Sequence, residues 1–133
     1  MKLAIPKERR AHEARVAISP DTVKRFKGLG LDIVVEAEAG AGAAIPDAAF
    51  TAAGATIAPD EASVLTDADI VLKVARPLTQ GEGGPDEILA MKRGAVLIGM
   101  LDPYRNRDQV RAYAAAGLTS FAMELVPRIT RAQ

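Results

Sequence analysis

Short apolar runs alternate along the chain with segments whose apolar residues follow a helical spacing. Runs such as DIVVEA, DIVLKV and AVLIGM predict strands, and the segments between them predict helices. Strands are expected at residues 3–5, 32–37, 55–58, 69–74, 95–100 and 119–123. Helices are expected at residues 20–27, 47–53, 60–65, 87–92 and 107–116. The pattern is therefore a repeated strand–helix unit.

The predicted strands carry near-continuous apolar runs, as in VLIGM at residues 96–100. Such runs suit strands that are covered on both faces of a parallel sheet, joined by right-handed βαβ crossovers. Ser19, Pro20 and Asp21 form a strong helix start, with a capping hydroxyl, a proline at the first helical position and an acid in the first turn. The sequence predicts a single α/β domain with a Rossmann-like or flavodoxin-like parallel sheet and helices on both faces.

Composition and charge exclude several classes of function. The 133 residues include 17 basic and 17 acidic ones, so the zero net charge argues against nucleic-acid binding. The chain has no cysteine and one histidine, so neither a disulfide nor a metal site is predicted. No apolar run approaches the roughly 20 residues that span a bilayer, so we expect a soluble, cytoplasmic domain without direct membrane insertion.

A glycine-rich stretch at residues 40–45 begins like a dinucleotide-binding loop, because it follows a predicted strand. The third fingerprint position requires glycine or alanine for close helix–strand packing, but Ile45 occupies it. Pro46 would also interrupt a helix start that faced a pyrophosphate. We therefore interpret this stretch as an ordinary strand-to-helix turn.

Three charged or titratable residues are the other candidates for chemistry. His12 lies in the charged stretch KERRAHEAR and is interpreted as a solvated loop residue. Arg15 follows the first strand, and Lys73 lies near the carboxyl end of an apolar strand, where ligands of open α/β sheets gather. The pair could hold a small carboxylate; the alternative is that both pair with local acids such as Glu8 or Glu124.

Four stretches together carry a resemblance to a known family. They are PKERRAHEARVAISPDTV (6–23), AGAGAAIPDAAF (39–50), DIVLKVARPL (69–78) and AMELVPRITRAQ (122–133). They resemble the N-terminal subdomain of the alanine dehydrogenase and pyridine nucleotide transhydrogenase family. The resemblance implies that residues 1–126 form this subdomain. It also implies that residues 127–133 begin a loop leading to a second, NAD-binding domain with no counterpart here.

The alanine dehydrogenase branch of this family holds pyruvate with an arginine and a lysine that match Arg15 and Lys73. That branch also uses a histidine on the strand that here reads AVLIGM, at the position of Met100. A thioether cannot exchange the proton that the interconversion of amine and ketone requires. The resemblance thus argues against alanine dehydrogenase activity.

The ending PRITRAQ is similar to the transhydrogenase branch, in particular to the NAD(H)-binding alpha subunit, or its first portion, in proton-translocating enzymes. There, a loop containing Arg, Gln and then Asp lies against the nicotinamide. Arg128 and Gln133 match the first two, and Ile129 lies between them. The resemblance implies these three residues as cofactor-binding residues, with no complete catalytic set in this chain.

The resemblance implies hydride transfer between NAD(H), bound mainly by the absent second domain, and NADP(H) on a partner component. It implies partners as well: the rest of the same subunit, the NADP(H)-binding and membrane components, and a second copy in a homodimer. The protein would then lie in the cytoplasm, peripheral to the membrane through its partner subunits, and the 133-residue chain alone would be inactive. Two alternatives stay open, an alanine-dehydrogenase-like oxidoreductase fragment and a non-catalytic module that binds a small carboxylate.

Overall fold

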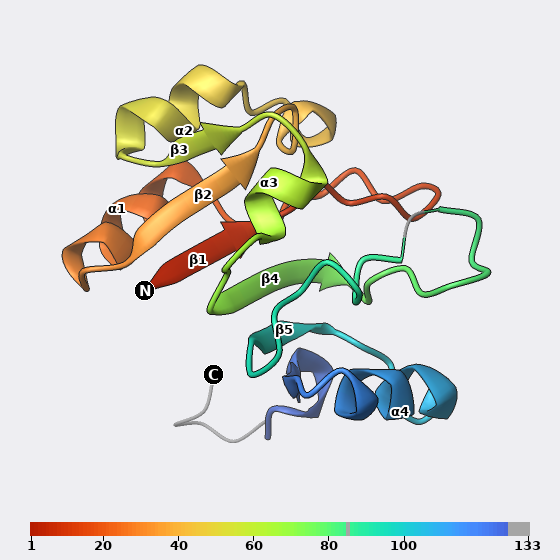
Figure 1. Ribbon diagram of the computed structural model, residues 1–133. Helices are drawn as coiled ribbons and strands as arrows, with labels where there is room; N and C mark the ends of the chain where they lie inside the picture. Colours follow the sequence, from red (N-terminus) through yellow and green to blue (C-terminus); the bar gives the residue numbers. More distant parts are fainter. Residues whose placement is uncertain (85, 128–133) are drawn as a thin grey trace.

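The computed structural model describes residues 1–84 and 86–127. Its centre is one six-stranded sheet in the order β3-β2-β1-β4-β5-β6, and every neighbouring pair of strands is parallel (Figure 1). The strands are β1 (Lys2–Ile5), β2 (Asp32–Glu36), β3 (Thr56–Ala58), β4 (Ile70–Ala75), β5 (Val96–Met100) and β6 (Thr119–Ala122). The structure confirms the predicted parallel α/β fold, and its strand order is the Rossmann order rather than the flavodoxin order.

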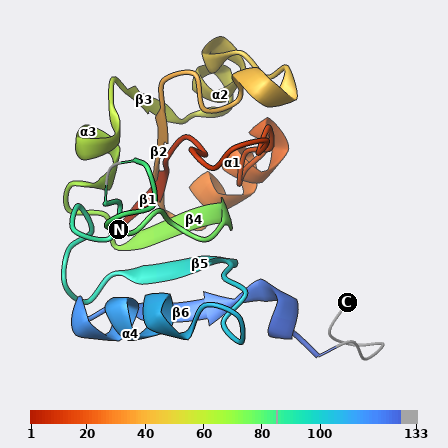
Figure 2. The same cartoon turned by 90° about the vertical axis from the view of Figure 1, so that its right-hand side faces the viewer.

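Helices pack on both faces of this sheet. Those in the described residues are α1 (Pro20–Gly28), α2 (Asp47–Ala53), α3 (Glu61–Leu65) and α4 (Arg107–Ala115), with the short 3-10 turns η1 (Ala41–Ala43) and η2 (Met123–Leu125). Figure 2 shows α1 and α3 on opposite sides of β1 and β2. The predicted start of α1 is confirmed, because the Ser19 hydroxyl accepts the backbone N–H of Thr22 at 3.2 Å.

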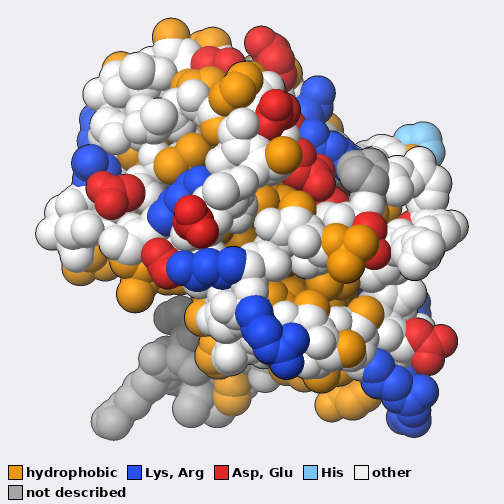
Figure 3. Space-filling model, viewed as in Figure 1, with side chains coloured by type: hydrophobic (Ala, Val, Ile, Leu, Met, Phe, Trp, Pro, Cys, Tyr) orange, Lys and Arg blue, Asp and Glu red, His pale blue; other side chains and the backbone are white. Residues whose placement is uncertain are grey.

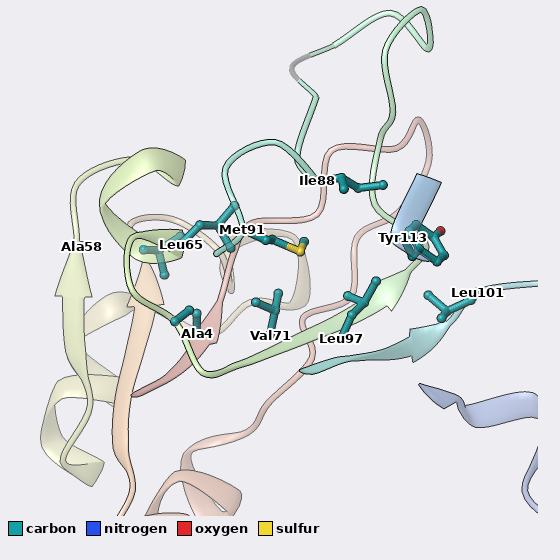
Figure 4. Packing of buried hydrophobic residues seen from close by; sticks show 11 residues of the cluster. Ala4, Ala58, Leu65, Val71, Ile88, Met91, Leu97, Leu101 and Tyr113 are labelled. Atoms are coloured by element: carbon teal, nitrogen blue, oxygen red, sulfur yellow. The ribbon is translucent and has the colours of Figure 1, made fainter. Parts of the chain in front are cut away.

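Alternation along the strands divides the core between the two faces. In β1, Leu3 and Ile5 join the apolar cluster under α1 and α2, whereas Ala4 joins the cluster under α3 and α4. Figure 4 shows this second cluster, in which Leu97 of β5 and Tyr113 of α4 are fully buried. Two-sided cover is the physical reason why these strands read as continuous apolar runs.

The described residues place helices on only one face of the half-sheet formed by β4, β5 and β6. On the side that carries α1, Ile98 borders an open hollow of about 520 Å³ together with residues of β6 and η2. Phe121, Met123 and Leu125 are half-exposed there. The face of the molecule seen in Figure 3, in contrast, shows basic and acidic side chains interspersed.

The predicted helix at residues 87–92 is wrong, because this segment forms turns. The Glu87 carboxylate is buried and accepts the backbone N–H of Leu78 at 2.8 Å. The side chain of Asp86 accepts the backbone N–H groups of Ile88 and Leu89. These contacts with distant and neighbouring groups replace a helical ladder that six residues would form only weakly.

Candidate functional site

The candidate site lies at the carboxyl ends of β1 and β4, where the strand order reverses and where ligands of open α/β sheets bind. The loop after β1 (6–19) and the segment after β4 (76–95) lie side by side there, at the right of Figure 1. The Arg10 guanidinium joins them by donating to the backbone oxygens of Arg76 and Pro77, at 2.8 and 2.9 Å. Two neighbouring hollows of about 420 and 310 Å³ open beside the first loop and share Val16 and Val74.

Arg15 lies on the rim of the larger hollow, with a side chain that is 65% exposed. Its guanidinium donates to both carboxylate oxygens of Glu13, at 2.9 and 2.7 Å. The hydrogen bond from Arg15 lowers the pKa of Glu13. An exposed pair of this kind stabilises a protein little, so an incoming anion could take the place of Glu13.

Lys73 borders the smaller hollow, but its side chain is only 1% exposed. Its ammonium group lies 3.4 Å from Glu8 and 3.4 Å from Glu87. Glu8 also accepts the backbone N–H groups of Val74 and Ala75, at 3.0 Å each, where the pairing of β4 with β5 shifts register. The carboxylate of Glu8 thus holds the end of β4 as well as the lysine.

The alternative partners left open by the sequence are now specified. Glu8 is a partner of Lys73, whereas Glu124 accepts backbone N–H groups of Leu101 and Asp102 instead. Arg15 and Lys73 border adjacent hollows, and each already has an acidic partner. The small-carboxylate pocket therefore stays a prediction, and a ligand there would compete with Glu13 and with two buried glutamates.

A second buried ion cluster surrounds Arg9, which the sequence reasoning missed. Arg9 donates to both oxygens of Glu36 and lies 2.8 Å from Glu61. The hydrogen bond to Glu36 raises the pKa of Arg9. Burial raises the pKa of Glu61, and the negative charge of nearby Glu87 adds to this effect. The signal in the sequence was an acid at the end of the apolar run DIVVE, since such a charge needs a buried partner.

His12 and Met100 have separate locations. His12 is exposed in the loop after β1, where its φ angle of 67° is left-handed. Met100 ends β5, is 40% exposed and borders the same hollow as Lys73. The position at which a proton-transferring group would face this hollow is thus occupied by a thioether.

The glycine-rich stretch 40–45 forms the turn η1, and its glycines are explained by packing inside the protein. A Cβ on Gly42 would lie 2.7 Å from the backbone oxygen of Ala14, and one on Gly40 would lie 2.5 Å from that of Ile45. The backbone N–H groups of Ala43 and Ile45 donate to the carbonyl of Gly40. They are therefore not free to bind phosphate, which supports the interpretation as an ordinary turn.

Glu82 connects the two loops and carries a pH prediction. Burial alone would raise its pKa, but hydrogen bonds from Arg10, Thr79 and Arg76 together hold the pKa of Glu82 well below its usual range. Its contribution to stability is therefore present above the pKa of the unfolded chain and is lost as the pH falls toward the folded pKa. We expect Glu82→Gln to lower the free energy of unfolding by about 1–3 kcal/mol at pH 7.

The difference between wild type and Glu82→Gln should shrink in acid, because the wild-type carboxyl group then becomes neutral too. Urea unfolding at about pH 7 and about pH 3 would measure this change. A difference that is the same at both pH values would contradict the assignment.

Arg128, Ile129 and Gln133 lie outside the described residues, so their cofactor-binding role stays a prediction. Within residues 1–84 and 86–127, no helix is long and apolar enough to cross a membrane. The same residues contain no group of three or more His, Asp or Glu side chains that could hold a metal ion.

Comparisons with known proteins agree with this architecture. The family model described as "Alanine dehydrogenase/PNT, N-terminal domain" matches residues 4–133. The chain is 55% identical over 133 residues to an NAD(P) transhydrogenase subunit alpha, in its first portion, from Rhodospirillum rubrum, covering all of this chain and 34% of that protein. It is 35% identical over 126 residues to the alanine dehydrogenase of Halomonas elongata, covering 95% and 32% of the two chains.

Solved structures give the same order of similarity. The crystal structure of transhydrogenase from Sinorhizobium meliloti matches with a TM-score of 0.91 and 48% identity, over all of this chain and 38% of that one. An L-alanine dehydrogenase matches with a TM-score of 0.87 and 28% identity, over all of this chain and 35% of that one. The chain spans about a third of the length of these relatives. It belongs to the alanine dehydrogenase/PNT family, as an N-terminal domain of that family.

Proposed function

We propose that this chain is the N-terminal part of the NAD(H)-binding component of a proton-translocating NAD(P) transhydrogenase. The observation that carries the proposal is the full-length similarity to a transhydrogenase alpha subunit at 55% identity, against 35% for an alanine dehydrogenase. The thioether of Met100 at the carboxyl end of β5 also disfavours the alanine dehydrogenase alternative.

The role of this part would be positional. Hydride transfer requires two nicotinamides that are close and aligned, and a domain that closes over the cleft can supply polar contacts and exclude water. The carboxyl edge of the sheet, with its two hollows, is the surface that would face NAD(H). Residues 127–133 would lead into the second domain, which would bind the pyrophosphate of NAD(H).

The proposed partners follow from the same assignment. They are the remainder of the subunit, a second copy in a homodimer, and the components that bind NADP(H) and cross the membrane. The full assembly would pass hydride between NAD(H) and NADP(H), with this chain peripheral to the membrane on the cytoplasmic side.

The natural full-length chain, mixed with an NADP(H)-binding component, would test the proposal. We expect NADH-dependent reduction of an NADP⁺ analogue, and no turnover of pyruvate, ammonia and NADH above background. The reverse result would assign the protein to the alanine dehydrogenase branch. Carboxylate binding through Arg15 without either activity would favour the binding module, and Arg15→Ala is the variant that would detect it.

A further inference from the structure

Six charged side chains are gathered under the carboxyl edge of β1, β2 and β4, and they do not balance. They are Glu8, Glu36, Glu61, Glu87, Arg9 and Lys73. Each cation lies between two carboxylates, Arg9 between Glu36 and Glu61 and Lys73 between Glu8 and Glu87. If every group were ionised, four negative charges would face two positive ones, and excess charge is costly where water is excluded.

Hydrogen bonding separates Glu61 from the other three acids. Glu8, Glu36 and Glu87 each accept at least one backbone N–H group, which stabilises the ionised form. The buried Oε2 atom of Glu61 has no hydrogen-bond partner among the described residues. Arg9 approaches that oxygen at 2.8 Å but makes its hydrogen bonds with Glu36. Glu61 is therefore the acid whose charge is least supported.

Either a cation or a proton could reduce the excess charge. A metal ion needs several ligands around one point, and the described residues contain no group of three acids or histidines that could hold one. The Glu61 side chain is only 12% exposed, so water also stabilises its charge poorly. A proton needs no additional space and neutralises the least supported carboxylate.

We infer that Glu61 is a proton-binding site, which stays protonated at pH values where exposed glutamates are ionised and whose deprotonation weakens the attachment of α3 to the sheet edge. The groups that face Glu61 come from each element around it: Arg9 after β1, Glu36 at the end of β2, Lys73 in β4 and Glu87 after β4. Three of the five groups in this cluster are acids. The inference does not depend on the proposed function.

The link to α3 follows from the position of Glu61 at the first residue of that helix. Val64 and Leu65 of the same short helix are fully buried against the sheet. Burial raises the pKa of Glu61, so its contribution to stability is present at low pH and is lost as the pH rises through the folded pKa. A second excess negative charge would then separate the start of α3 from Glu36 and Glu87.

Direct titration tests the proton site. In the natural full-length protein labelled with ¹³C at the glutamate carboxyl carbon, the Glu61 signal is identified by its loss in Glu61→Gln. We expect its midpoint to lie above the value of about 4.3 that glutamate has in unfolded chains. A midpoint at or below that value would overturn the inference.

Hydrogen exchange followed by mass spectrometry tests the consequence for α3. After correction for the intrinsic effect of pH, the protection of residues 61–66 should fall in the wild type as Glu61 loses its proton. Glu61→Gln should abolish this loss of protection, whereas Glu38→Gln, a matched change at an exposed glutamate, should retain it. An equal pH dependence in wild type and Glu61→Gln would show that the proton does not control α3.

Discussion

Replacing Lys73 with methionine is expected to lower the free energy of unfolding by about 3–5 kcal/mol, the usual cost of removing one partner from a buried ion pair. The substitution retains most of the side-chain volume but leaves Glu8 and Glu87 without a cation. Glu8 also holds the end of β4 through two backbone N–H groups, so the damage should reach the sheet. Chemical denaturation of wild type and variant would measure the loss.

A second substitution distinguishes the electrostatic effect from poor packing. Glu87→Gln removes one of the two stranded charges, and its side-chain oxygen can still accept the backbone N–H of Leu78. Lys73→Met combined with Glu87→Gln should therefore recover part of the lost stability. Lys92→Met, which breaks a solvent-exposed pair with Asp69, should change stability little. A double variant no more stable than Lys73→Met alone would contradict the role of the buried charges.

Arg128→Ala in the complete protein is expected to weaken NADH binding or slow hydride transfer. If the substitution removes a charge-assisted hydrogen bond of about 1–3 kcal/mol, the effect is roughly fivefold to 150-fold. The physical basis is that the second domain would hold Arg128 and Gln133 against the nicotinamide. Stopped-flow measurement of hydride transfer and titration of NADH would separate the two effects.

The matched control is Arg111→Ala, which removes an exposed arginine from α4. Its rate and affinity should equal those of the wild type. The isolated 133-residue chain should bind NADH weakly or not at all, because the 40–45 turn has its amides engaged with carbonyl oxygens and offers no phosphate loop. Micromolar binding by the isolated chain, or an unchanged Arg128→Ala protein, would contradict the assignment.

Much of the fold could be predicted from local sequence patterns. Ser19 and Pro20 start α1 as expected, and Gly54 ends α2 in the left-handed conformation that glycine adopts without strain. Residues 87–92 show the limit of such patterns. Their helical spacing was real, but the buried contacts of Glu87 determined the backbone.

The candidate site could be predicted only in part, for a related reason. Lys73 was identified because a cation in an apolar strand requires a partner, and Glu8 was among the partners considered. Glu87 and Glu61 were not, because each lies in a segment that reads as an ordinary solvated helix. Nothing in the sequence near either residue shows that the segment turns its acid toward the sheet.

The sequence by itself determined the alternation of strands and helices, the parallel sheet and the failure of the 40–45 turn as a phosphate loop. These features depend on side chains within a few residues of one another, so periodicity and turn chemistry specify them. The tertiary structure alone decided that β1 lies beside β4, which brings Glu8 to Lys73 and Arg10 to Glu82. Such pairs join residues more than 60 positions apart, and their energies depend on burial that only the folded chain creates.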